Sequence, residues 1–336
     1  MGYKIYREKF ADLFHELRAS YEIYAPVTKK DKGMYSDTDL ITYDKVESFT
    51  EIVFDKKTFF SPKEIVFPIR QTLFYFTEDS VLEPTKLEKD IVIFARACDI
   101  NSFRSLDAIF LQNGPYEDPY YKKLRQRVKF ILLPCDGFEN CYCACLGTNI
   151  TDNYSAYVDV RDDAVYCKVK DAYWKGLWSK YGEESEVEPR YVSKNENTFE
   201  IPQKINNSIF EHQMWSEYTN RCTGCGRCTV VCPTCTCFTV HDIRYDDNSK
   251  YGERRRVWAS CQIDGFTEMA GGHGYRHKQG ERTRFRVLHK ISDFKKRFGF
   301  QMCVGCGRCE DACQEYISLK NCIHKISEIM AEEEKV

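Results

Sequence analysis

Four cysteines lie close together in one short run of the chain. With two, two and three residues between them, they are Cys222, Cys225, Cys228 and Cys232. Three thiolates at this spacing wrap a short loop around three irons of a 4Fe-4S cubane, while the fourth cysteine usually binds the other cubane of a pair. The run therefore predicts iron–sulfur chemistry.

The same spacing occurs a second time near the C-terminus. The cysteines of this second run are Cys303, Cys306, Cys309 and Cys313. If the fourth cysteine of each run binds the cubane of the other run, the chain holds two 4Fe-4S clusters with crossed ligands. The predicted ligands of the first cluster are Cys222, Cys225, Cys228 and Cys313. Those of the second cluster are Cys303, Cys306, Cys309 and Cys232.

Glycines inside both runs support this interpretation. Gly224 and Gly226 lie in the first run, and Gly305 and Gly307 lie in the second. They supply the small bulk and the backbone freedom that a loop around a cubane needs. Structural zinc is the main alternative, but zinc sites use two separated Cys-x2-Cys pairs. Disulfide bonds fit the pattern less well, because such short loops do not easily reach disulfide geometry.

The N-terminal half contains another group of cysteines. Cys98 follows an apolar segment at 91–95, and Cys135 follows a second apolar segment at 130–133. Parallel strands bring their C-terminal ends to the same edge of a sheet, where α/β proteins place ligands. We therefore expect a candidate third 4Fe-4S site on Cys98, Cys135, Cys141 and Cys143, with Asp99 as a substitute ligand and Cys145 as a spare.

These N-terminal cysteines are also compatible with two alternative roles. Free cysteine is often a small buried hydrophobe, which would reduce the group to ordinary packing. The spacing of Cys135 and Cys141 also matches the first half of the ligand signature of sirohaem-coupled clusters, but Cys145 overlaps that half and no second half follows. Core packing is expected for the remaining cysteines, which are Cys167, Cys235, Cys237, Cys261 and Cys322.

Basic residues precede the second cysteine run. They are Arg282, Arg284, Arg286, His289, Lys290, Lys295, Lys296 and Arg297. A charged helix face is ordinarily only solvated. Near a cluster with several negative thiolates and sulfides, the same charge would instead raise the reduction potential and guide an acidic partner.

The composition excludes several classes of protein. The chain has 336 residues, 43% of them hydrophobic, with 18 cysteines and a formal net charge of -2. A general nucleic-acid-binding protein carries a clear basic excess, so no nucleic-acid partner is expected. The N-terminus shows no apolar signal core, and no apolar run of about 18 residues predicts a membrane span. Clustered thiols indicate a reducing compartment, so we expect a cytoplasmic protein.

The predicted elements divide the chain into two domains. Helices are expected near 5–19, 285–298 and 312–330, and strands over 21–27, 64–67, 91–95, 130–133, 156–160 and 164–169, the last two as a hairpin. The flat hydrophobicity of several strands indicates burial on both faces. We therefore expect an α+β protein, with an α/β domain over 1–200 that holds the candidate third site. A mainly α-helical dicluster ferredoxin domain over 205–336 would hold the two 4Fe-4S clusters.

With these residues identified, the whole chain resembles the iron–sulfur electron-transfer subunit of anaerobic sulfite reductases. It is more distantly similar to the iron–sulfur β subunit of sulfhydrogenase-type nickel–iron hydrogenases. Besides both cysteine runs, the segments that carry the resemblance are 21–27, 96–99, 140–143, 270–273 and 286–290. The chain departs from the pattern at Gln314, where a proline commonly follows the fourth cysteine. It also departs at Cys145, where the hydrogenase relatives tend to have serine, which leaves the choice of ligands in the N-terminal site open.

The resemblance implies an electron-transfer subunit of a dissimilatory-type sulfite reductase. A flavin and NAD(H)-binding subunit would deliver electrons, this chain would relay them, and a sirohaem subunit would reduce sulfite to sulfide. The chain would then be part of an oxidoreductase complex but would have no catalytic residues of its own. An iron–sulfur relay subunit of a nickel–iron (sulf)hydrogenase is the alternative of the same type. A zinc-stabilised assembly protein is the alternative from another class.

Overall fold

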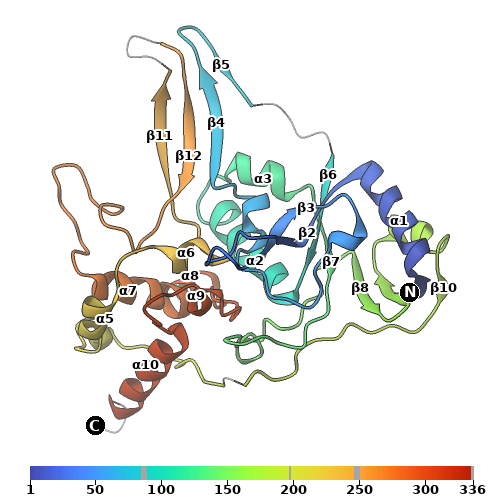
Figure 1. Ribbon diagram of the computed structural model, residues 1–336. Helices are drawn as coiled ribbons and strands as arrows, with labels where there is room; N and C mark the ends of the chain where they lie inside the picture. The colour runs from blue at the N-terminus through green and yellow to red at the C-terminus, as the bar shows by residue number, and fades with distance from the viewer. Residues whose placement is uncertain (85–88, 197, 246–249, 334–336) are drawn as a thin grey trace. The chain divides into compact units, whose positions relative to one another are not determined.

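The computed structural model describes residues 1–84, 89–196, 198–245 and 250–333 (Figure 1). The chain divides into two units, each made of several segments. Unit 1 consists of Met1–Phe67, Thr85–Phe138 and Gly147–Lys194, and unit 2 consists of Pro68–Pro84, Glu139–Leu146 and Asn195–Val336. The predicted domain ranges, 1–200 and 205–336, differ from these units because two segments of the N-terminal half belong to unit 2.

Unit 1 is built on an eight-stranded sheet with the order β10-β1-β9-β8-β7-β6-β2-β3. Its strands are β1 Gly2–Tyr6, β2 Tyr21–Lys29, β3 Leu40–Lys45, β6 Asp90–Ala95, β7 Val128–Leu132, β8 Ala156–Arg161, β9 Ala164–Val169 and β10 Glu183–Glu184. Strands β2, β6, β7 and β8 are parallel to one another, and the outer pairs are antiparallel. The predicted hairpin is confirmed as β8 and β9.

Helices cover both faces of this sheet. Successive side chains of a strand point to opposite faces, so each inner strand contributes apolar residues to the core on both sides. On one face, Phe94 of β6 packs on Phe14 of α1 (Arg7–Ser20), with ring centroids 6.2 Å apart. On the other face, Phe130 of β7 meets Phe103 of α2 (Ala97–Leu111) edge to face, at 4.8 Å. Burial of the inner strands on both faces is thereby confirmed. The smaller elements of the unit are α3 Pro119–Arg125, α4 Ala172–Trp178, η1 Phe49–Glu51 and η2 Pro62–Ile65.

One predicted strand of unit 1 is wrong. Residues 64–67 were expected to be extended, but they lie in and just after the 3-10 turn η2. Pro62 occupies one of the first two positions of this turn, where its fixed φ favours helical geometry. Val66 and Phe67 are nevertheless fully buried. The apolar residues of this segment therefore indicate burial but not an extended strand.

Unit 2 contains a second sheet, which the sequence pattern does not predict. Figure 1 shows its four strands side by side, in the antiparallel order β11-β12-β4-β5. They are β4 Arg70–Phe76, β5 Val81–Leu82, β11 Phe238–Arg244 and β12 Gly252–Trp258. Arg254 of β12 pairs with Asp242 of β11 at 2.7 Å, and buried Arg256 donates to Gln71 of β4 at 2.6 Å. Cross-strand polar pairs therefore replace apolar alternation in this sheet.

The helices of unit 2 carry the cysteine runs and enclose a separate core. They are α5 Trp215–Arg221, α6 Arg227–Val230, α7 Gln279–Leu288, α8 Phe294–Phe298, α9 Arg308–Asp311 and α10 Leu319–Glu333, with the 3-10 turns η3 Ala144–Leu146 and η4 Asn207–Phe210 and the π-helical turn η5 His289–Asp293. Trp215, Leu288 and Ile323 are buried in the core that these helices share. The predicted fold class, an α/β region followed by a largely helical dicluster region, is confirmed. None of the helices in the described part of the chain combines the length and the apolar composition needed to cross a bilayer.

Candidate functional site

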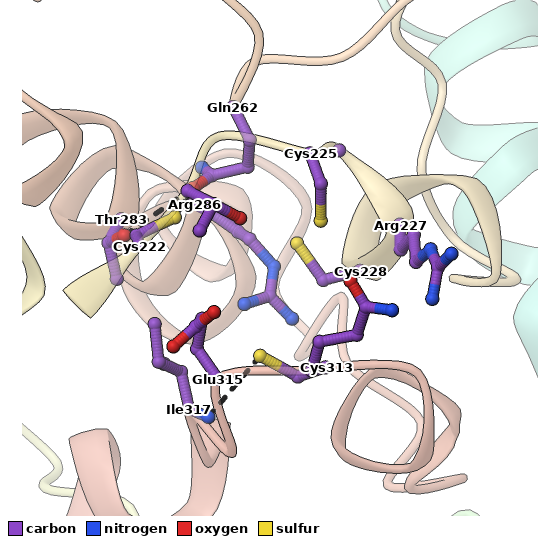
Figure 2. A pocket seen from close by; sticks show the side chains of 13 residues that line it. Cys222, Cys225, Arg227, Cys228, Gln262, Thr283, Arg286, Cys313, Glu315 and Ile317 are labelled. Carbon is purple, nitrogen blue, oxygen red and sulfur yellow. Dashed lines mark hydrogen bonds between the residues drawn. The ribbon is translucent and has the colours of Figure 1, made fainter.

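Three cysteines of the first run and one cysteine of the second run line one pocket. Figure 2 shows the sulfur atoms of Cys222, Cys225, Cys228 and Cys313 directed into the same space, which we call the first pocket. Other residues around it include Gln262, Thr283, Arg286, Glu315 and Ile317. The structure therefore brings together the four residues predicted to bind the first cluster. That they bind iron stays a prediction.

The loop of the first pocket depends on two glycines. Gly224 and Gly226 have φ values of 70° and 75°, in the left-handed region that residues with a Cβ rarely adopt. A Cβ on Gly226 would also lie 3.0 Å from Cδ1 of Ile263. Gly226 directly precedes α6, so this backbone turn directs Cys228 back toward the pocket that Cys222 and Cys225 line.

The second run forms an equivalent pocket with the remaining cysteine of the first run. Cys232, Cys303, Cys306 and Cys309 all line this second pocket. Its other lining residues include Tyr142, Thr234, Arg286, Lys290, Val304 and Leu319. Helices α6 and α9, which follow the two cysteine loops, lie against each other. The crossed grouping that the spacing predicted is therefore the grouping of the pockets.

The segment Glu139–Leu146 covers the loop of the second pocket. The backbone N–H of Tyr142 donates to the Gly305 carbonyl at 2.8 Å, and the Cys141 thiol donates to the Cys306 carbonyl at 3.3 Å. The Tyr142 hydroxyl lies 3.5 Å from Sγ of Cys303. A Cβ on Gly305 would lie 2.7 Å from the Tyr142 carbonyl, so this close approach requires glycine. The sequence pattern indicates thiols in this segment but does not predict the contacts that Tyr142 makes with the second cysteine run.

Arg286, in the last turn of α7, lines both pockets. It is only 7% exposed, and Figure 2 shows its guanidinium pointing into the first pocket. Burial acts to lower the pKa of this guanidinium, but Cys228 on one side and Cys309 and Cys232 on the other hold the pKa well above its usual value. Cysteine side chains of both pockets therefore favour the charged form of this buried guanidinium.

Lys290 places a second buried cation at the second pocket. It lies in the π-helical turn η5, a kind of irregularity that often occurs at functional sites. Its carbonyl accepts from the backbone N–H groups of Met302 at 3.2 Å and Cys303 at 3.4 Å, and its Nζ donates to Oγ1 of Thr234 at 2.9 Å. Burial acts to lower its pKa, but Cys232 and other thiols raise it overall. The basic residues near this run are therefore not all on a solvated face.

Backbone hydrogen-bond donors and burial have opposite effects on the pKa of the cysteine thiols. The N–H of Ile317 lies 3.3 Å from Sγ of Cys313, and the N–H of Gly305 lies 3.4 Å from Sγ of Cys303. Such donors favour the thiolate form. Burial raises the pKa of Cys228 to about 12, although Arg286 acts to lower it. The free Cys228 thiol is therefore protonated near neutral pH, and metal binding must release its proton.

The two pockets differ in access to solvent. Cys225 at the first pocket is exposed, whereas Cys303 and Cys306 at the second pocket are buried, with 9% and 8% of each residue exposed. A cofactor in the first pocket would therefore lie nearer the surface of the unit.

The residues of the predicted third site belong to different units. In unit 1, Cys98 and Cys135 follow the C-terminal ends of β6 and β7, as predicted, and both are half-buried. Asp99 beside them is fully buried and accepts a hydrogen bond from the Tyr43 hydroxyl at 3.1 Å.

The other two predicted ligands of the third site lie in unit 2. Cys141 and Cys143 are buried there, and Sγ of Cys143 lies 3.8 Å from Oδ1 of Asn195. Cys145, the predicted spare, lies in the turn η3 and is half-buried. The third cluster stays a prediction.

The isolated cysteines follow two patterns. Cys167 and Cys322 are fully buried in the cores of their units, which confirms the prediction of core packing. Cys235, Cys237 and Cys261 instead form a group in which the Cys237 side chain is hydrogen-bonded to the other two, and this contact lowers the pKa of Cys261. Core packing alone therefore does not describe these three residues.

Comparisons with known proteins agree with the cysteine geometry. Residues 221–317 match a family described as a 4Fe-4S dicluster domain, and residues 187–235 match a second family of the same description. The chain is 28% identical to the sulfhydrogenase 2 subunit beta of Pyrococcus furiosus over 344 residues, which cover 97% of this chain and 98% of that relative. No solved structure matches the chain. The chain is therefore an iron–sulfur protein with an electron-transfer role.

Proposed function

We propose that the chain is the electron-relay subunit of a dissimilatory-type anaerobic sulfite reductase. The observation that supports the relay most directly is the pair of pockets, each lined by three cysteines of one run and the fourth cysteine of the other. The first cluster would be held by Cys222, Cys225, Cys228 and Cys313. The second cluster would be held by Cys303, Cys306, Cys309 and Cys232. When bound, 4Fe-4S clusters supply electron transfer over a range of potentials that their protein surroundings set.

The surrounding residues fit two anionic clusters. Arg286 and Lys290 are buried cations beside the thiols, and a buried charge is costly unless an opposite charge compensates it. The backbone N–H groups of Gly305 and Ile317 lie close to ligand sulfur atoms, where they stabilise negative charge. Left-handed glycines give both loops their close approach to the pocket. The donor set and its countercharges therefore match the proposed cofactors.

Partner subunits would exchange electrons with this chain at the first pocket. Exposed Cys225 lies there, whereas two cysteines of the second pocket, Cys303 and Cys306, are buried and the other two are half-buried. A flavin and NAD(H)-binding subunit would supply the electrons, and a sirohaem subunit would use them to reduce sulfite. In this proposal the chain supplies binding, orientation and electrostatics, while the sulfite chemistry belongs to the cofactors of the partner.

The proposal is tested with the purified, cluster-loaded chain and a strong artificial electron donor. The chain alone should become reduced but should form no sulfide from sulfite, and addition of the sirohaem subunit should restore sulfide formation. Sulfide formation by the chain alone would contradict the assignment as a relay.

An electron relay in a hydrogenase is the second candidate, favoured by the end-to-end similarity to a sulfhydrogenase beta subunit. The two candidates differ in the partner that accepts or supplies electrons. The complex isolated with this chain should contain sirohaem and oxidise its reduced clusters with sulfite if the first candidate is correct. Nickel in that complex, together with reduction of the clusters by hydrogen gas, would support the second candidate instead.

A further inference from the structure

Arg286 has a position that no other residue around the pockets shares. In the described part of the chain, it is the one residue that lines both the first and the second pocket. It projects from the last turn of α7, immediately before the π-helical turn η5. Its side chain therefore occupies the wall between the two groups of cysteines.

No carboxylate among the described residues forms an ion pair with Arg286, although Glu315 also lines the first pocket. Within residues 1–84, 89–196, 198–245 and 250–333, the structure gives its guanidinium neither an ion pair nor a hydrogen-bond acceptor, although the residue is 7% exposed. By contrast Arg282, one turn earlier on α7, pairs with Asp264 and donates to the Arg276 carbonyl. An uncompensated buried guanidinium is unfavourable, so its compensating charge must come from the two pockets.

We propose that Arg286 is a shared countercharge that raises the reduction potentials of both clusters. This inference rests on the proposed pair of 4Fe-4S clusters. A cluster with four thiolate ligands is anionic and becomes more negative when it gains an electron. A fixed positive charge nearby therefore stabilises the reduced form, and low polarity strengthens the effect. Because one guanidinium faces both pockets, it acts on both reductions.

Lys290 offers a comparison within the same segment. It is also a buried cation, but it lines the second pocket and not the first. Removal of its charge should therefore change one potential, whereas removal of the Arg286 charge should change two. Arg284, also on α7, lines neither pocket, and its side chain donates to the Phe210 carbonyl. It provides a control in which the same charge is removed from the same helix.

The test is a reductive titration of the anaerobically purified chain, in which each cluster takes up one electron from the donor. Electron paramagnetic resonance monitors the reduction of each cluster. The variants are Arg286→Met, Arg286→Lys, Lys290→Met and Arg284→Met. Arg286→Met should move both reduction steps to lower potential, by at least a tenfold change in each equilibrium, or about 59 mV for one electron. Lys290→Met should move one step, and Arg284→Met should move neither.

Arg286→Lys separates the charge from the structural role of the side chain. It should keep both steps closer to those of the wild type than Arg286→Met does, and it should retain iron if the methionine variant loses it. An Arg286→Met variant that shifts one step or none would overturn the inference. So would a lysine variant that behaves like the methionine variant. If the wild-type chain itself shows no pair of reduction steps, the proposed function fails rather than this inference.

Discussion

Cys232 belongs to the first cysteine run by sequence, but its side chain lines the pocket of the second run. Cys313 has the converse position at the first pocket. Each predicted cluster therefore depends on a residue from the other run. This exchange makes the two cysteines a matched pair for mutagenesis.

We predict that Cys232→Ser perturbs the cluster held by residues 303–309 and leaves the other cluster intact. Serine is a poorer ligand than the thiolate, so the spectrum of the affected cluster should change or its iron should be lost. Cys313→Ser is the control and should affect the cluster held by residues 222–228. The measurement is the electron paramagnetic resonance spectrum of each reduced variant. A Cys232→Ser spectrum that changes only in the 222–228 cluster would refute the crossed arrangement.

A second prediction concerns Gly305, which lies close to the backbone of Tyr142. Gly305→Ala should lower the stability of the protein by about 1–3 kcal/mol, because alanine is strained at a φ of 62° and its Cβ would meet the Tyr142 and Cys143 backbone at 2.7 Å. Gly176→Ala in α4 is the control, since nothing lies within 4 Å of its Cβ. It should be neutral or stabilising by up to ~1 kcal/mol. Thermal unfolding measures both, and equal melting temperatures for the two variants would contradict the argument.

Single residues differed in how far the sequence could predict them. The cluster cysteines and their glycines were predictable, because a cubane demands fixed spacing and free backbone within one short loop. Arg286 and Tyr142 were not, because their roles depend on segments that only the folded chain brings together. The spacing of charges along 282–297 could not distinguish buried Arg286 from half-buried Arg284.

At the scale of elements, apolar content predicted the inner strands of unit 1 and failed for the sheet of unit 2. Strands β6 and β7 each contain a run of apolar, buried residues, 91–95 and 130–132, so composition alone reveals them. Strand β12 instead carries Arg254, Arg255 and Arg256, whose partners lie on its neighbours or within the strand itself. This pairing cannot be predicted from composition, because folding brings the partner residues together from separate strands.

A third prediction concerns the start of α4. Asp171 caps this helix by accepting from the Trp174 N–H at 3.1 Å, and it pairs with Lys129 at 2.6 Å. Burial acts to raise its pKa, but these contacts lower it below the usual 3.8. Because the folded-state pKa is lowered, the stabilisation is present above the unfolded-state pKa and is lost as the pH falls through the folded-state value.

Asp171→Asn should therefore destabilise the protein by about 1 kcal/mol near neutral pH, with a smaller loss as the pH falls below about 4. Asparagine still caps a helix, so the variant isolates the effect of charge. Chemical denaturation at several pH values measures the difference. A deficit of the same size at neutral and at strongly acidic pH would show that the charge is not responsible.

At the scale of the whole molecule, the least predictable feature was the discontinuity of unit 2. Pro68–Pro84 provides strands β4 and β5, and Glu139–Leu146 covers the second cysteine loop. Both segments are preceded and followed along the chain by segments of unit 1. Composition shifts mark long linkers, but they do not reveal a short segment that pairs with a distant part of the sequence. The expected boundary near residue 200 was therefore an incomplete description.

The fourth prediction is the iron content of the chain. Two cubanes correspond to about eight irons per chain, and a third on Cys98, Cys135, Cys141 and Cys143 would raise this to about twelve. The iron and sulfide content should fall with Cys98→Ser and with Cys143→Ser if the third cluster exists. A fully loaded chain with about eight irons, whose two variants keep the wild-type spectrum, would reduce these cysteines to ordinary packing.

The central claim is that this chain relays electrons through paired 4Fe-4S clusters, and the most direct measurement is a quantitative reductive titration of the anaerobically purified chain. We predict an uptake of about one electron per cubane. Signals from two reduced clusters should appear, broadened by mutual interaction because a single residue, Arg286, borders both pockets. A folded chain that contains zinc but no iron or sulfide, and that takes up no electrons, would contradict the account.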